Sequence, residues 1–199
     1  MKNKTVIIIN GFPRAGKDTL VEDLSKMFLD RELVKVHNYS SVSLVKEVAS
    51  HVGYTEDEKL KNPEIWRPFL SDLKDILDQH LNACEKSIYD KIDSIEPGDI
   101  IFIHVREPHN IASIESYYFD DPTVTTTSLL VSRPSMTNES RENANNHADK
   151  LVESYEYDLV FQNPVDDELT YESIVAYEHF KEIFYTTLSD SRKSLMSNI

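Results

Sequence analysis

The sequence predicts an α/β protein built on a parallel β-sheet, and three observations carry this prediction. Residues 6–9 are a run of β-branched side chains, which is typical of a buried parallel strand. A turn between Gly11 and Gly16 follows, and after it comes the apolar spacing of an amphipathic helix. Further strand and helix patterns alternate along the chain, an order that produces a parallel sheet covered by helices on both faces.

The turn after the first strand matches the phosphate-binding loop pattern G-x-x-x-x-G-K, in the strand–loop–helix context that supports such a match. Glycines let backbone N–H groups converge on phosphate oxygens, the helix N-terminus adds positive partial charge, and the lysine reaches the β- and γ-phosphates. Asp18 occupies the usual Ser/Thr position, and Thr19 follows it. The expected nucleotide-binding residues are Gly11, Phe12, Pro13, Arg14, Ala15, Gly16, Lys17, Asp18 and Thr19. The alternative is a plain glycine turn in which Lys17 only begins a helix.

The remaining elements are expected in a regular order. Strands are predicted at residues 34–39, 100–105, 125–131 and 157–161, and helices after the loop to about 28, at 44–52, from 63 to about 77, from about 110, and around 174–184. Segments 54–63 and 135–156 are polar, and the second is interpreted as mobile. An apolar stripe at helical spacing is interpreted as core packing; it comprises Trp66, Phe69, Leu70, Leu73, Ile76 and Leu77.

Composition excludes several classes of protein. The length of 199 residues suits one domain with insertions, and the net charge of 21 − 35 = −14 disfavours binding to nucleic-acid backbones or anionic membranes. Cys84 is the only cysteine, which excludes an intrachain disulfide and a Cys-rich metal site. The first apolar run is too short for a signal peptide, and no stretch is long enough to span a membrane, so a cytoplasmic location is the default expectation.

Basic residues gather where the predicted strands end. Ligands of parallel sheets bind beyond the carboxyl ends of the strands, which here are residues 10–17, 40–41, 106 and 133. Three of the seven arginines, Arg14, Arg106 and Arg133, are expected at this edge together with Lys17. This clustering in an acidic chain indicates a phosphate site independently of the loop motif, although a structural ion pair is the alternative for each arginine.

The loop G-F-P-R-A-G-K-D-T resembles that of the nucleoside monophosphate kinases, and its G-K-D-T form is most similar to the deoxynucleoside monophosphate kinases and the related animal-type phosphomevalonate kinases. Four further segments are similar to this family in the same order. They are residues 39–47 before the acceptor-binding helix, R-P-F-L-S-D-L-K-D at 67–75, residues 103–108 at strand 3, and Y-D-L-V-F-Q-N at 157–163.

The resemblance implies the three-layer P-loop NTPase fold in a single domain (1–199), with a five-stranded parallel sheet, an acceptor-binding insertion at about 40–95 and a lid at about 133–156. It also implies transfer of the γ-phosphoryl group of ATP-Mg²⁺ to a nucleoside monophosphate. The roles carried over by position are Lys17, Arg133 and Arg141 in catalysis, with Arg133 also near adenine, Ser40, Ser41, Arg67 and Arg106 at the acceptor, and Asp18 and Thr19 at the metal through water.

One position departs from the family pattern. His104 stands where the related kinases carry an acidic residue at the end of strand 3, and imidazole is a poor Mg²⁺ ligand. Either Asp18, Thr19 or Glu107 replaces that contact, or metal use is weakened; the roles of His147 and Asp149 stay open. The alternatives are therefore a phosphomevalonate-type kinase and a catalytically silent nucleotide-binding module, while a nucleic-acid-dependent ATPase is disfavoured by the charge.

Overall fold

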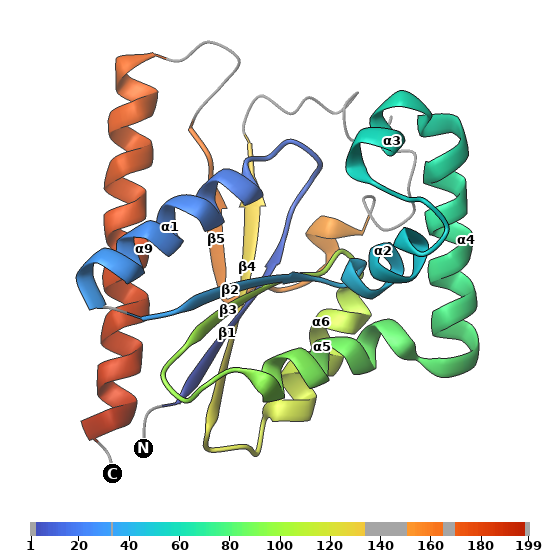
Figure 1. Ribbon diagram of the computed structural model, residues 1–199. Helices are drawn as coiled ribbons and strands as arrows, with labels where there is room; N and C mark the ends of the chain where they lie inside the picture. Colours follow the sequence, from blue (N-terminus) through green and yellow to red (C-terminus); the bar gives the residue numbers. More distant parts are fainter. Residues whose placement is uncertain (1–2, 33, 134–150, 165–169, 198–199) are drawn as a thin grey trace. The chain divides into compact units, whose positions relative to one another are not determined.

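The computed structural model describes residues 3–32, 34–133, 151–164 and 170–197 (Figure 1). The chain forms two compact units. The first comprises Met1–Asn38 and Ile95–Ile199, and the second comprises Tyr39–Ser94. The second unit nearly coincides with the insertion expected at 40–95, and its role in acceptor binding stays a prediction.

A five-stranded sheet with all strands parallel organises the first unit. Its strands are β1 (Lys4–Asn10), β2 (Val36–Ser40), β3 (Ile100–His104), β4 (Val124–Ser132) and β5 (Leu159–Gln162). Their order is β2-β3-β1-β4-β5, so β1 is central and lies between β3 and β4. Both faces of β1 are covered, which explains why residues 6–9 are apolar without alternation. The predicted fold class, α/β with a five-stranded parallel sheet between layers of helices, is confirmed.

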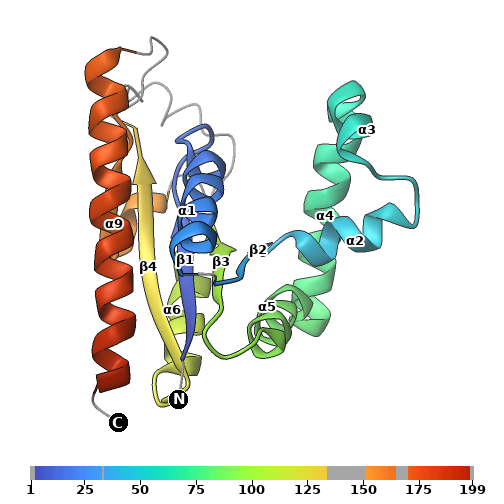
Figure 2. The same cartoon turned by 60° about the vertical axis from the view of Figure 1, so that its left-hand side comes forward.

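Helices occupy both faces of this sheet. α1 (Lys17–Glu32) packs against α9 (Tyr171–Ser197), the long helix coloured orange to red in Figures 1 and 2. Both contribute buried side chains to one core cluster with Ile7, Ile9, Leu129 and Val131 of the sheet. α6 (Pro108–Tyr118) packs on β4, and together with Thr126 of β4 it lines a surface cavity of about 440 Å³. Because side chains alternate along a strand, Thr126 lies on the opposite face of the sheet from Leu129 and Val131, and α6 covers that face.

The second unit is helical. It contains α2 (Ser43–Ser50), α3 (Glu56–Lys61), α4 (Pro63–Leu81) and α5 (Ala83–Ser94), and α4 packs on the other three. The sequence interpretation missed α3 and α5. For α3 the signal was present, because the Thr55 hydroxyl caps the helix by accepting a hydrogen bond from the Glu58 N–H at 3.1 Å. Acidic residues in its first turn and basic residues in its last turn also favour a helix.

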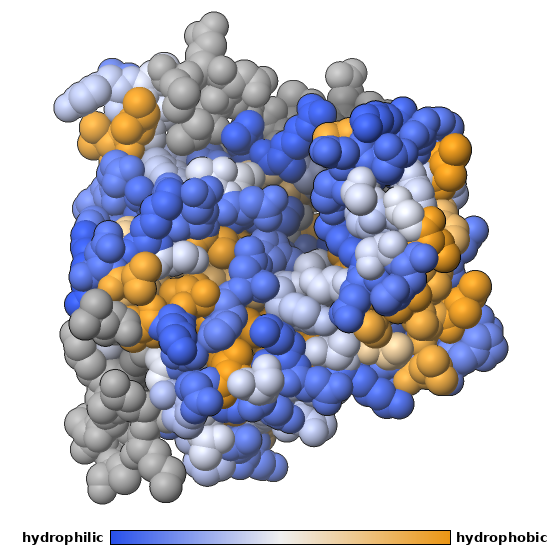
Figure 3. Space-filling model, in the orientation of Figure 1, coloured by the Kyte–Doolittle hydropathy of each residue, from blue (hydrophilic) through white to orange (hydrophobic). Residues whose placement is uncertain are grey.

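The prediction that the apolar stripe of α4 is core packing is only partly right, because its side chains are half-buried or exposed. No residue of α4 is fully buried, and Phe69 and Ile76 keep 38% and 56% of their surface exposed. Figure 3 shows this apolar surface in orange at the right-hand side, where Figure 1 draws α4. The physical reason is that the three shorter helices packed on α4 leave part of its 19 residues uncovered, whereas β1 has a strand on each side and both of its faces are covered.

Element boundaries differ from the predictions by a few residues. The helix expected from about 110 begins at Pro108, the strand expected from 157 begins at Leu159, and the helix expected to reach 52 ends at Ser50. A 3₁₀ turn, η1 (Val152–Ser154), lies in the segment 135–156 that was predicted to be mobile, and residues 135–150 of that segment fall outside the described residues. None of the helices that the structure describes is long and apolar enough to cross a membrane.

Candidate functional site

The loop between β1 and α1 needs both of its glycines. Gly11 has φ +147°, and a Cβ there would lie 2.1 Å from the Val131 carbonyl oxygen of β4. Gly16 has φ +94°, and a Cβ there would lie 2.3 Å from Nδ2 of Asn163. These close approaches press the loop against the ends of β4 and β5, and only a residue without a side chain fits. The spacing G-x-x-x-x-G therefore reflects two steric contacts of the tertiary structure.

Lys17, the first residue of α1, folds back over the loop. Its Nζ donates hydrogen bonds to the carbonyl oxygens of Gly11 at 2.5 Å and Phe12 at 2.8 Å. The ammonium group of Lys17 thus lies over the loop and is hydrogen-bonded to two neutral carbonyl oxygens. Phosphate oxygens bind an ammonium group more strongly than neutral carbonyls do, so a nucleotide can draw it away from them.

Two asparagine side chains connect the loop to neighbouring segments of the chain. Asn10 accepts a hydrogen bond from the Gly11 N–H at 2.8 Å through Oδ1, and its Nδ2 donates to the Arg106 carbonyl at 3.1 Å and to the Tyr157 hydroxyl at 2.8 Å. Asn163 donates from Nδ2 to the Ala15 carbonyl at 2.9 Å, and it is 4% exposed. Sequence reasoning placed both residues at strand ends without a role. Buried amides that join loop and sheet indicate that the loop is preorganised.

Strand order places two of the predicted arginines on opposite sides of the loop. β3 and β4 flank β1, so Arg106 follows the strand on one side and Arg133 follows the strand on the other. The backbone of Arg106 is tied to Asn10, and its side chain is exposed, whereas Arg133 is half-buried. Arg14 is exposed at the tip of the loop with φ 64°. The strand order thus brings three basic residues to the edge of the sheet at which the loop lies.

Asp18, Thr19 and His104 surround the start of α1. Asp18 and Thr19 are exposed in its first turn, and the Asp18 side chain is 96% exposed. His104 ends β3 opposite Ile9 of β1, and its Nδ1 lies 3.9 Å from Oδ1 of Asp18. Burial lowers the pKa of His104 to about 4, with Asp18 acting against and Lys17 in favour of the shift. The imidazole is therefore neutral at physiological pH.

The residues assigned to the acceptor lie partly in the second unit. Ser40 forms a local turn there, since its N–H donates to the Ser43 hydroxyl at 3.0 Å and its own hydroxyl accepts from the Val42 N–H at 3.4 Å. Ser41 is buried, and Arg67 is exposed on α4. Their assignment to the acceptor stays a prediction. Arg141, His147 and Asp149, like most of the expected lid, lie outside the described residues.

No family model and no curated protein matches this chain. Among solved structures, APE1195 is similar with a TM-score of 0.52 at 14% identity, over 96% of this chain and 98% of that one. TT1252 from Thermus thermophilus has a TM-score of 0.45 at 11% identity, covering 92% of this chain and 97% of its own. Shikimate kinase from Bacteroides thetaiotaomicron has a TM-score of 0.41 at 11% identity, covering 90% and 98%. At such identities the likeness to APE1195 concerns the fold and not the activity.

Proposed function

We propose that this protein transfers the γ-phosphoryl group of ATP to a small acceptor, and that the acceptor is a (deoxy)nucleoside monophosphate. The observation that carries the proposal is the preorganised loop, with Lys17 at its mouth and Arg106 and Arg133 following the strands on either side. Phosphoryl transfer demands positioning and charge neutralisation more than covalent chemistry. A rigid, cationic phosphate cradle supplies both.

Each basic residue has a distinct part in this proposal. Lys17 and the loop amides bind the β- and γ-phosphates of ATP, and Arg133 binds beside the adenine and phosphates. Arg106 and Arg67 hold the phosphate of the acceptor, since the planar guanidinium group pairs with a phosphate through two parallel hydrogen bonds. Ser40 and Ser41 contact the acceptor, and Arg141 closes onto the transferred group. Asp18 and Thr19 would hold a divalent cation that accompanies ATP, and this cation would neutralise phosphate charge.

Two alternatives use the same loop. A phosphomevalonate-type kinase differs only in its acceptor, which would need an apolar pocket. A catalytically silent nucleotide-binding module is favoured by one observation, namely the neutral His104 at the end of β3, where P-loop enzymes typically use a carboxylate for the metal.

An assay of ADP release distinguishes these functions. Mg-ATP is supplied with one candidate acceptor at a time, namely each ribo- or deoxynucleoside monophosphate and phosphomevalonate. We expect turnover with one or a few monophosphates. Lys17→Ala should lower kcat by about 10²–10³-fold, because this lysine acts on phosphate charge that develops in the transition state. Lys26→Ala is the matched control, since Lys26 is an exposed lysine on the same helix. ATP binding without turnover of any acceptor would favour the silent module, and full turnover by Lys17→Ala would refute the proposed kinase.

A further inference from the structure

His104 and Asp18 lie at a separation that suits a shared cation. The 3.9 Å between Nδ1 and Oδ1 is too long for a hydrogen bond. It is shorter than about 4.2 Å, the span of two ligands on opposite sides of one cation with bonds of about 2.1 Å. A single ion can therefore contact both atoms after a small rotation of Asp18, whose exposed side chain is free to turn.

The donor set does not suit Mg²⁺ well. That ion demands oxygen ligands, and here one of the two facing atoms is an imidazole nitrogen. The imidazole is only 16% exposed, and its Nε2 is buried without a hydrogen-bond partner among the described residues. Burial keeps a fixed, neutral imidazole pointing toward Asp18. Neutral imidazole is a good ligand for divalent transition ions.

We propose that the cation accompanying the nucleotide is a divalent first-row transition ion, bound directly by Nδ1 of His104 and a carboxylate oxygen of Asp18. Oxygens of the nucleotide phosphates and water complete its coordination. This inference rests on the proposed binding of a nucleotide at the loop, and it does not require that phosphoryl transfer occurs.

Because of Lys17, the affinity of this site for a cation should depend on whether a nucleotide is bound. Lys17 directly precedes Asp18 in the first turn of α1, so its positive charge repels a cation held by the Asp18 carboxylate. Phosphates drawn to Lys17 remove this repulsion and add ligands of their own. The cation alone should therefore bind weakly, and it should bind tightly only when ADP is present.

Mn²⁺ is a suitable probe because electron paramagnetic resonance reports its binding and its ligands directly. The full chain is titrated with Mn²⁺ with and without ADP, and pulsed measurements on the ternary complex detect coupling to a coordinated ¹⁴N. We expect this coupling in the wild type and its loss in His104→Asp, from which Mg²⁺ should displace Mn²⁺ at about tenfold lower concentration. His179→Gln removes an exposed histidine from α9 and should change neither result.

The outcomes separate the two proposals. If ADP fails to bind by calorimetry, both the proposed function and this inference fall. If Mn²⁺ and ADP bind together without ¹⁴N coupling in the wild type, or if His104→Asp leaves the Mg²⁺/Mn²⁺ preference unchanged, only the inference falls. Asp18→Asn keeps the size of the side chain and guards against a folding defect in His104→Asp. It should weaken Mn²⁺ binding while the ¹⁴N coupling persists.

Discussion

Arg14 has an unusual backbone conformation for its residue type. Its φ of 64° lies in the left-handed region, where a side chain costs roughly 1–2 kcal/mol relative to glycine. It is exposed and forms no ion pair with the residues that the structure describes, so no such pair offsets this cost. Strained residues of this kind concentrate at functional sites. In the proposed kinase, the guanidinium group of Arg14 would contact the phosphates of the nucleotide.

Arg14→Gly should therefore separate stability from activity. We expect the free energy of unfolding to stay equal or rise by up to about 1 kcal/mol, because relief of the left-handed strain exceeds the entropic cost of glycine. Turnover should fall, and Arg14→Lys should recover part of it because the charge is restored. Urea denaturation and the ADP-release assay measure the two effects. A clear loss of stability, or unchanged turnover, would contradict this role.

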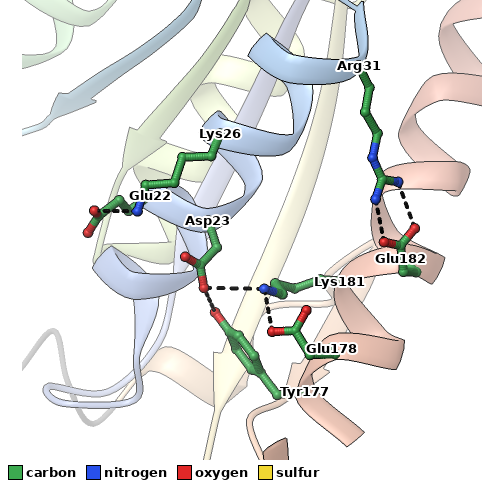
Figure 4. Close-up of polar contacts among 8 residues, drawn as sticks. All are labelled: Glu22, Asp23, Lys26, Arg31, Tyr177, Glu178, Lys181 and Glu182. Atoms are coloured by element: carbon green, nitrogen blue, oxygen red, sulfur yellow. Dashed lines mark hydrogen bonds and ion pairs between the residues drawn. The ribbon is translucent and has the colours of Figure 1, made fainter. Parts of the chain in front are cut away.

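At the scale of elements, α9 is fastened to α1 by a partly buried polar cluster (Figure 4). The Tyr177 hydroxyl donates to Asp23 at 2.9 Å, and Nζ of Lys181 lies 3.6 Å from Asp23 and 2.8 Å from Glu178. The side chain of Lys181 is only 11% exposed, and the two carboxylates lie beside its ammonium group. Arg31 and Glu182 form a second, exposed pair between the same helices.

Lys181→Ala should lower the free energy of unfolding by about 1–3 kcal/mol, because the substitution leaves Asp23 partly buried without its cation. Lys181→Met keeps the aliphatic stem and isolates the contribution of the charge. Lys26→Ala removes a fully exposed pair on α1 and should leave the unfolding midpoint in urea unchanged. Equal midpoints for all three variants would show that the cluster does not stabilise the helix pair.

In the second unit, Glu56 joins α2 to α3. Its carboxylate pairs with Nζ of Lys46 at 2.7 Å and accepts a hydrogen bond from the Tyr54 hydroxyl at 2.7 Å. These two contacts lower the pKa of Glu56 from 4.5 to about 2, with the Lys46 contact contributing most. A depressed pKa means that the stabilisation is fully present above pH 4.5 and is lost as the pH falls toward 2.

Glu56→Gln should lower the thermal midpoint near pH 6, and the difference from the wild type should shrink as the pH falls from about 5 to about 3. Glu47→Gln, at an exposed position of α2, should show no such narrowing. Circular dichroism at several pH values measures both variants. A difference that stays constant or grows on acidification would mean that Glu56 does not act through its charge.

At the scale of the whole molecule, the last helix, α9, is part of the hydrophobic core around β1. Tyr177, Phe184 and Leu188 of α9 are buried in the cluster that includes β1 and α1. This core is therefore complete only when residues more than 150 positions apart in the sequence come into contact, as Asp23 and Tyr177 do.

A chain that ends at residue 164 should consequently fail to form a cooperative core. Its exposed apolar surface favours aggregation. We expect it to accumulate in the insoluble fraction on expression, or to show no cooperative thermal transition by circular dichroism if it is recovered. A truncated chain that unfolds cooperatively with the wild-type midpoint would show that α9 is not part of the folding unit.

Local chemistry explains which features could be predicted. The β-branched run at 6–9 and the apolar spacing after the loop predict a buried strand and the start of a helix from neighbouring residues alone, and the glycine spacing with Lys17 matches the pattern of a phosphate-binding loop. Alternation of strands and helices determined the parallel sheet. The helix α3 was missed because it is short and has no buried apolar residue, although the cap at Thr55 was readable. For α5 the signal was present, because Cys84, Ile88 and Ile92 recur every four positions, but it was not used.

Only the tertiary structure decided what surrounds the loop. Strand order β2-β3-β1-β4-β5 brings the ends of β3 and β4 to either side of Lys17, and no local pattern encodes which strands become neighbours. The amides of Asn10 and Asn163 acquire roles only when strand ends distant in sequence meet at the loop. The same holds for His104 and Asp18, which are 86 positions apart and face each other at 3.9 Å because β3 pairs with β1. Sequence alone predicted a phosphate site, whereas non-local packing determined which side chains lie around the loop.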